Sequence, residues 1–294
     1  MRALSVLAIL GAVLAGGLLW AGGADRAVMA WALEGQRAAQ SGMAGALRAL
    51  RAGEPSAVLP LLGVCFAYGV FHAVGPGHGK VLIGGYGAAR AVGPLRLSAV
   101  ALAASLAQGA TAILFVGAGL WLLGLGRETM TDLADRVLRP LGFAAMAGLG
   151  LWLVWRGLRG AFARPGEPRA EHGARCSHAH APPPEAILAA TSWRELAALV
   201  ASVAIRPCTG ALLLLVLTAQ LGLFFWGVAG TLAMALGTAS VTVAVALAAV
   251  GLRRGMLAGL SGGAARVARV QPAIEIAAGL AIAWIAGGLA LATM

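Results

Sequence analysis

The stretch YGVFHAVGPGHGKVLIGGYG, residues 68–87, ends a long apolar run with a Gly-Pro-Gly sequence. Two of the five histidines, His72 and His78, flank this sequence, and the only lysine, Lys80, follows it. Proline lacks the amide hydrogen that a helix needs, and glycine adopts backbone conformations outside the helical range. The stretch therefore predicts a helix that is interrupted between two imidazoles.

The composition places this helix in a membrane. Apolar residues make up 60% of the 294 residues and charged residues only 11%, whereas soluble domains carry roughly 25% charged residues. About 20 apolar residues are enough to cross a bilayer as a helix. We therefore predict an all-α polytopic membrane protein, surrounded by the lipid bilayer, with spans at 3–22, 56–74, 97–124, 140–158, 196–217, 221–250 and 273–292.

The N-terminal region has two interpretations. Residues 1–24 are either a membrane anchor or a cleaved signal peptide, and we favour a retained anchor with a cytoplasmic N-terminus. Residues 25–55 then form an external segment, which we expect to be an amphipathic helix along the outer membrane surface. Gln36 and Gln40 interrupt the apolar stripe of this helix.

The net charge of +11 is explained by membrane topology rather than by nucleic acid. With the N-terminus inside, 14 of the 22 Lys and Arg residues fall in cytoplasmic segments, 7 in outer segments and Arg206 within a span. This bias agrees with the positive-inside rule. We expect a multi-pass protein of a bacterial-type cytoplasmic (inner) membrane, with no nucleic-acid partner and with homo-oligomer formation left open.

The spans after the N-terminal segment fall into two similar sets of three. A cytoplasmic loop rich in Pro, Arg and His, residues 159–194, separates residues 56–158 from residues 195–294. The first helix of each set is broken, by HAVGPGHGK in one and AIRPCTGAL in the other. An odd number of helices per repeat makes the repeats run in opposite directions. Inverted repeats with interrupted helices in matching positions are typical of secondary transporters, whose site lies at the repeat interface.

The first broken helix carries candidate metal ligands. Cys65 and His72 are two helical turns apart and therefore share a face, although a buried free cysteine usually only packs. The residues of the break, Gly75, Pro76 and Gly77, allow the chain to fold His78 back towards His72 through positive φ angles. Imidazole suits Ni, Co, Zn and Cu(II). The alternative is a pair of interfacial histidines beside an ordinary loop.

The second broken helix carries a buried charge. Arg206 within a span costs roughly 2.5–3.5 kcal/mol, so it should face a partner or water. Glu275 is a candidate counter-ion, or Arg206 instead bonds the carbonyls that Pro207 and Gly210 free from the helix. Cys208 is a possible thiolate ligand or a packing residue.

Three further groups of polar residues have weaker signals. Gln108 and Thr238 occupy matching places in the second helix of each set and either line a path or pack between helices. Lys80 is expected to anchor the cytoplasmic end of its helix, because a cation is not a metal ligand. The long loop has a histidine-rich composition that is typical of metal capture, carried by His172, Cys176, His178 and His180.

A resemblance to a known family rests on the broken helices, the His-containing loop, and the motifs HAVGPGHGK and RPCTGALLLLVL…AMALGTA. Over about residues 56–293 the chain resembles the nickel/cobalt transporter family of the NicO/RcnA type. The resemblance implies transport of Ni²⁺ or Co²⁺ without a prosthetic group, outward in the exporter branch, with His72 and His78 on the metal path. The chain departs from related members at Gly75, where they often have an acidic residue, and in a loop with fewer histidines.

We therefore expect a secondary transporter that exports nickel or cobalt. An importer of the same metals is the nearest alternative. A membrane thiol–disulfide electron carrier that uses Cys65 and Cys208 is a second alternative, although it leaves the histidines unexplained. The chain has no GxxxxGK[ST] nucleotide-binding motif, and we expect that it is not an enzyme.

Overall fold

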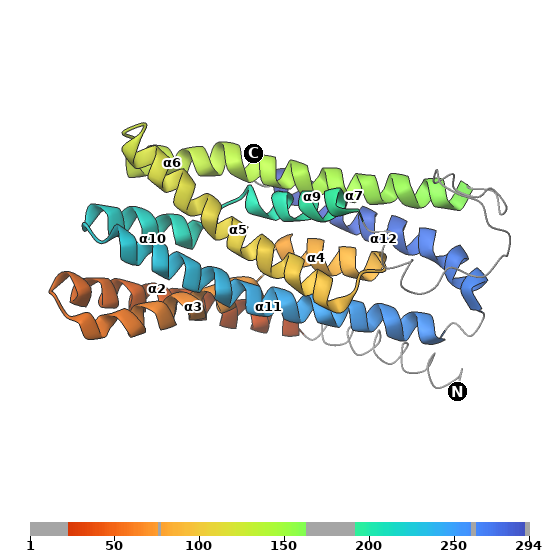
Figure 1. Cartoon of the computed structure of the whole chain (residues 1–294), viewed down its shortest axis with the longest axis horizontal. Helices are drawn as coiled ribbons and strands as arrows, with labels where there is room; N and C mark the ends of the chain where they lie inside the picture. Colours follow the sequence, from red (N-terminus) through yellow and green to blue (C-terminus); the bar gives the residue numbers. More distant parts are fainter. Residues whose placement is uncertain (1–22, 76–77, 163–191, 260–262, 292–294) are drawn as a thin grey trace, which may run out of the picture.

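The computed structural model describes residues 23–75, 78–162, 192–259 and 263–291, and the regular structure in these residues is helical. The elements, in chain order, are α2 (Ala24–Arg51), the 3₁₀ turn η1 (Pro55–Ala57), α3 (Val58–Val74), α4 (His78–Ala89), α5 (Pro94–Trp121), α6 (Arg127–Leu133), the π-helical turn η2 (Ala134–Leu138), α7 (Arg139–Phe162), α9 (Trp193–Ala204), α10 (Thr209–Gln220), α11 (Phe224–Gly259) and α12 (Gly263–Leu291). They form an elongated bundle (Figure 1).

The prediction of an all-α membrane protein is confirmed. Five helical segments in the described residues are long and apolar enough to cross a bilayer, and a sixth is formed if α9 and α10, bent by 58° at their junction, make one broken span. The predicted first span, residues 3–22, lies outside the described residues. The predicted span 140–158 is extended at its start, because α6 and η2 continue into α7.

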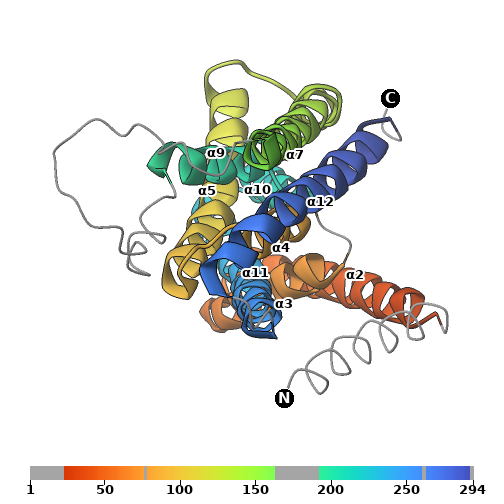
Figure 2. The same cartoon turned by 90° about the vertical axis from the view of Figure 1, so that its right-hand side faces the viewer.

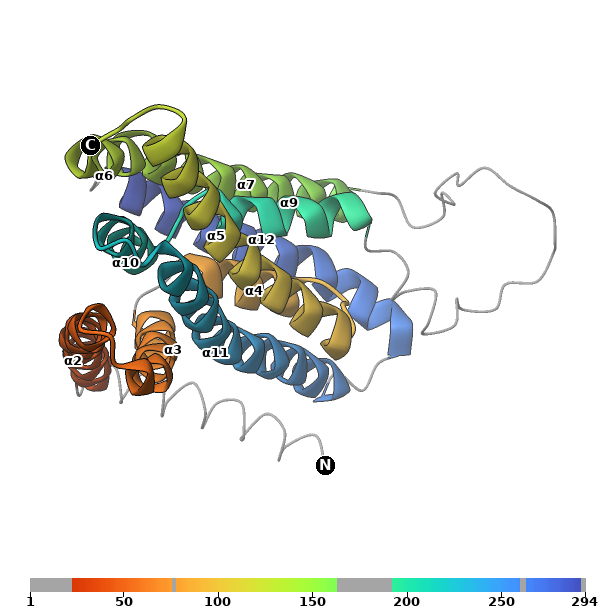
Figure 3. The same cartoon turned by 60° about the vertical axis from the view of Figure 1, so that its left-hand side comes forward.

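The predicted external helix, residues 25–55, is present as α2, but its apolar face packs on protein. Met43, Leu47 and Leu50 on α2 are buried and join the apolar cluster that includes Leu61 of α3. The two helices form a hairpin (Figure 3), whose turn uses Gly53 at a φ of 87°. The C-terminal half of the predicted stripe thus packs on a neighbouring helix, whereas Leu33 in its N-terminal half is exposed, so contact of that half with a membrane surface stays a prediction.

The broken helices lie in the interior of the bundle. Viewed roughly along the bundle, α4 and α10 are enclosed by longer helices (Figure 2). The segment α3–α4 runs from the α2–α3 turn towards the opposite end of the bundle, and α9–α10 runs the other way (Figure 1). The long helices pair reciprocally, since α5 packs on α9 and α10 while α11 packs on α3 and α4. This arrangement agrees with inverted repeats, which remain a prediction.

Close helix contacts depend on glycine. A Cβ atom added to Gly69 of α3 would lie 2.0 Å from the carbonyl oxygen of Met234, and one added to Gly237 of α11 would lie 2.1 Å from that of Phe66. The backbones of α3 and α11 therefore touch, as small residues allow in membrane helices. Gly150 of α7 makes a similar contact with α12.

The apolar core has two parts with a polar layer between them. Along α5, Ala101 and Ala104 belong to one cluster and Ala112 and Val116 to the other. Along α11 the order is reversed, because Met234 belongs to the same cluster as Ala112 and Ala246 to the same cluster as Ala104. Polar residues occupy the middle of both helices, and there the candidate site lies.

Candidate functional site

A cavity of about 530 Å³ lies midway along the bundle, between the two apolar clusters. Both broken helices and both long helices α5 and α11 contribute to its wall, together with α7 and α12. Its polar lining residues are His72, Lys80, Ser105, Gln108, Arg206, Thr238 and Thr242. The structure therefore brings together five of the residues that the sequence singled out in separate segments: His72, Lys80, Gln108, Arg206 and Thr238.

His72 is half-buried at the C-terminal end of α3, and two side chains fix its ring. Its Nδ1 atom lies 3.4 Å from Oε1 of Gln36 on α2. The ring also stacks on Tyr68 one turn earlier, with centroids 5.9 Å apart and planes 8° apart. When Nδ1 donates to Gln36, Nε2 keeps its lone pair, which is the usual arrangement of a metal-binding histidine.

Cys208 meets His72 from the second broken helix. It precedes α10 as the N-cap residue, and its side chain lies close enough to that of His72 for the two groups to influence each other's charge. The backbone amides of Gly210 and Ala211 face the sulfur. Because a helix N-terminus stabilises negative charge, a thiolate formed here on metal binding would be favoured.

Gly210 has a role other than the predicted loosening of the helix. It lies within the regular part of α10, and a Cβ atom at this position would come 2.4 Å from the Tyr68 ring. Glycine is therefore required for the close approach of α10 to α3. This approach brings Cys208 to the end of α3 that carries His72.

The break after α3 differs from the predicted one in its backbone. Gly75 has φ −56° and ψ 172°, an extended conformation that any residue adopts. Because a residue before proline is disfavoured in the helical region, Pro76 explains the end of α3 without a positive φ at Gly75. Pro76 and Gly77 themselves lie outside the described residues.

Lys80 does not anchor a cytoplasmic helix end as predicted. Its ammonium group donates to the carbonyl oxygen of Val74 at 2.9 Å and to that of Gly75. These carbonyls are left without helical partners at the end of α3. Lys80 folds back to the break because the break offers these acceptors, and it lines the cavity as a result.

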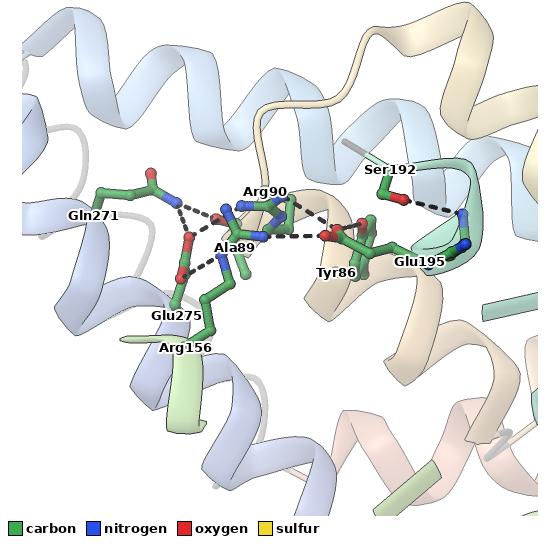
Figure 4. A network of polar contacts seen from close by, with 9 residues as sticks. Tyr86, Ala89, Arg90, Arg156, Ser192, Glu195, Gln271 and Glu275 are labelled. Atoms are coloured by element: carbon green, nitrogen blue, oxygen red, sulfur yellow. Dashed lines mark hydrogen bonds and ion pairs between the residues drawn. The ribbon is translucent and has the colours of Figure 1, made fainter. Parts of the chain in front are cut away.

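Arg206 and Glu275 are not paired with each other in the structure. Glu275 instead forms ion pairs with Arg90 and Arg156, each at 3.4 Å, in a polar network shown in Figure 4. The Arg206 guanidinium lies 4.9 Å from the centroid of the Phe143 ring. A cation over an aromatic face is attracted by the ring. The Phe143 ring therefore stabilises the positive charge of Arg206 in part.

Gln108 and Thr238 bond across the two halves. Gln108 on α5 donates to the carbonyl oxygen of Arg206 at 2.8 Å, within the second break. Thr238 on α11 donates to that of Gly69 on α3 at 3.3 Å. Each long helix therefore supports the broken helix of the other half.

The remaining sequence candidates lie elsewhere. Cys65 is buried in the apolar cluster with Leu214, and a Cβ atom on Gly230 would lie 3.0 Å from its sulfur. Neither Cys65 nor Cys208 lines the central cavity itself, but Cys208 lines a small adjoining pocket that shares Gln108 and Thr238 with it. The side chain of His78 lies outside the described part of the chain, although α4 begins at this residue. The predicted loop ligands lie outside it too: His172, Cys176, His178 and His180.

The sequence did not single out Gln36 as a site residue, but it contained a signal for it. Gln36 interrupts the apolar stripe of α2, and the interruption coincides with the ring of His72. A polar residue on the buried face of a helix indicates a polar partner.

The arrangement offers an imidazole nitrogen and a thiol to a late first-row dication. Among the described side chains, no group of three His, Cys, Asp or Glu residues is placed to hold a metal ion. The two side chains of His72 and Cys208 have amide, hydroxyl and carbonyl oxygens nearby. Such a site suits an ion that is bound and released again better than a permanently bound ion.

Comparisons with known proteins agree with this chemistry. A sequence model of the NicO family, described as high-affinity nickel-transport protein, matches residues 58–175 and 168–294. A Haemophilus influenzae protein, provisionally named a nickel/cobalt efflux system, is 30% identical over 199 residues. The aligned region is 60% of this chain and 61% of the relative, so the chain spans less than two thirds of that protein. No solved structure matches the chain. Because the family matches cover most of its length, the chain belongs to the NicO family of nickel-transport proteins.

Proposed function

We propose that this chain moves Ni²⁺ or Co²⁺ across the cytoplasmic membrane through the central cavity, in the direction of efflux. His72 and Cys208 are the ligands, His78 is the third candidate, and Gln36 orients the His72 ring. Under the positive-inside rule the basic segments face the cytoplasm, so the end of α7 and the start of α9, with Arg159 and Arg194, are assigned to that side.

One observation carries this proposal. An imidazole from one broken helix and a thiol from the other lie close enough to influence each other's charge, and the imidazole lines a cavity halfway along the bundle. In secondary transporters the cargo binds near the middle of the membrane, where interrupted helices of two repeats meet. Imidazole and thiolate select late transition metals over Mg²⁺ and Ca²⁺.

Efflux is favoured over import by the name of the Haemophilus influenzae relative. Import of the same ions would use the same ligands, so it is the second candidate. The electron-carrier alternative is weakened because Cys65 packs in the apolar cluster, whereas Cys208 lies beside His72.

The test measures cell-associated nickel and cobalt in a metal-sensitive host with the wild-type chain or with variants at equal membrane abundance. The wild type should lower both metals, and His72→Ala and Cys208→Ser should each restore them. Cys65→Ser is the matched control, because it makes the same change at a buried cysteine away from the cavity, and it should keep full activity.

Other results would lead to different conclusions. Higher cell-associated metal with the wild type means import through the same site. Equal loss in both cysteine variants with an active His72→Ala variant supports an electron carrier. No change in either metal contradicts nickel and cobalt transport. Uptake of nickel into everted membrane vesicles, whose outer face is the former cytoplasmic face, checks the efflux direction independently.

A further inference from the structure

The position of Lys80 is unusual for a carrier of dications. Lys80 is the only lysine of the chain, yet its half-buried side chain lines the same cavity as His72. The described residues in the cavity wall include no carboxylate that could balance its charge, and Arg206 adds a second positive group. A bound Ni²⁺ or Co²⁺ would therefore share the cavity with like charges.

The atoms that hold the ammonium group are those of a cation site. Its acceptors are the carbonyl oxygens of Val74 and Gly75. Both lie at the C-terminal end of α3, where carbonyls have no helical partner and the helix dipole is negative. Gly75 is buried, so unpaired carbonyl oxygens here would have little access to water. Lys80 supplies the positive charge that this end of the helix requires.

This cation site adjoins the proposed metal ligand. A Cβ atom on Gly75 would lie 3.6 Å from the carbonyl oxygen of His72 and 3.7 Å from Nε2 of Gln36. The other end of the same Gln36 amide faces the His72 ring at 3.4 Å. Lys80 and His72 also line one cavity, so the ammonium group and an ion on His72 would share it, and the repulsion between the two positive charges is strong in a partly desolvated cavity.

We propose that Lys80 is a built-in competitor of the transported ion. Its ammonium group occupies the Val74 and Gly75 carbonyls when the cavity holds no metal, and it leaves them when Ni²⁺ or Co²⁺ binds. The carbonyls then face the dication or its water in place of the ammonium. In both states the two carbonyl oxygens therefore have a positively charged partner. The competition also weakens metal binding, so that the ion is released on the far side of the membrane. This inference depends on the proposed function.

The single lysine makes the inference testable in the unmodified protein. The purified chain in detergent is treated with formaldehyde and cyanoborohydride, with and without saturating NiCl₂, and methylation of Lys80 is followed by peptide mass spectrometry. Nickel should speed the methylation of Lys80, because the ammonium group loses its two carbonyl acceptors. The His72→Ala variant should show no such change.

A substitution pair gives a second measurement. Lys80→Met removes the charge at similar length, and Lys80→Arg keeps it. In titration calorimetry Lys80→Met should bind Ni²⁺ about tenfold more tightly than the wild type or better, while Lys80→Arg stays close to it. In vesicles Lys80→Met should also release nickel more slowly.

The outcomes separate the two proposals. Absence of nickel binding to the wild type contradicts the proposed function and this inference with it. Nickel binding that leaves Lys80 methylation unchanged, or slows it, contradicts the inference alone. Weaker nickel binding by a folded Lys80→Met variant also contradicts it, since it would assign Lys80 a supporting role at the site. If Lys80→Met does not fold, the methylation experiment decides.

Discussion

At the scale of single residues, His72 depends on a neighbour that carries no charge. The ring of His72 could rotate freely at the end of α3, but the Gln36 amide and the Tyr68 ring restrict it. Outer groups that orient a metal-binding histidine usually matter 10- to 100-fold for affinity. If His72 binds the metal as proposed, Gln36 selects which nitrogen of its ring faces the cavity.

Replacing Gln36 tests this role. Gln36→Leu should weaken Ni²⁺ binding about tenfold, near the low end of that range because the 3.4 Å contact is long. Titration calorimetry on the purified protein measures the effect. Gln36→Glu keeps an acceptor oxygen and should retain more affinity than Gln36→Leu. Equal binding by all three proteins would mean that Gln36 does not orient His72.

Replacing Gly75 is expected to have no effect, although the sequence made this glycine a central residue of the break. Its φ of −56° suits any amino acid, and an added Cβ atom would meet nothing closer than 3.6 Å. Gly75→Ala should therefore leave the melting temperature and metal transport at wild-type levels. A large loss of folded protein would show that the break needs glycine freedom at this position.

At the scale of elements, the α3–α11 contact holds the polar layer together. Gly69 and Gly237 bring the two backbones into contact, and the neighbouring Thr238 donates to the carbonyl oxygen of Gly69. Any widening of this contact would move Thr238 away from α3 and change the cavity wall.

A pair of glycines on α11 separates this effect from a change in helix propensity. Gly237→Ala would place a Cβ atom 2.1 Å from a backbone oxygen of α3, whereas Gly251→Ala would meet nothing within 4 Å. We expect Gly237→Ala to destabilise the protein by about 1–3 kcal/mol or more, seen as a lower melting temperature and less nickel transport. Gly251→Ala should be neutral or slightly stabilising. Similar melting temperatures for the two variants would contradict the close contact.

The elements also show what the sequence could predict. Hydropathy located the spans after residue 55, and Pro76 and Pro207 located both breaks, because proline acts on its own backbone. The partner of each element was harder to predict. Part of the α2 stripe packs on α3 rather than facing a membrane surface, and Glu275, one candidate partner of Arg206, pairs with other arginines, since sequence spacing does not tell which apolar face or charge will be near. Lys80 was misplaced for the same reason, as its acceptors exist only where α3 ends.

At the scale of the whole molecule, one network connects the two halves. Arg90 and Arg156, from the first set of helices, share Glu195 and Glu275, from the second, through contacts of 3.2–3.4 Å (Figure 4). Gln271 adds a bond to Glu275 at 2.9 Å. The network thus joins α9 and α12 to the end of α4 and to α7.

Burial decides how much this network contributes. The side chains of Arg90 and Glu275 are each 6% exposed, so little water is available to replace a lost partner. Removing one member of a buried ion pair costs about 3–5 kcal/mol, because the other charge is left uncompensated. An exposed ion pair between adjacent turns of a helix contributes only about 0.3–0.5 kcal/mol to stability.

Glu275→Gln and Asp132→Asn make the same change, acid to amide, in these two settings. Glu275→Gln should lower stability by about 3 kcal/mol, since both arginines keep Glu195 but lose their second carboxylate. Asp132 pairs with Arg136 on an exposed helix surface, so Asp132→Asn should change the melting temperature little. Melting temperatures of the two variants in one detergent, each against the wild type, measure the difference. If the two variants lose equal stability, the network is not what holds the halves together, and glycine-mediated contacts such as that between α7 and α12 carry the junction instead.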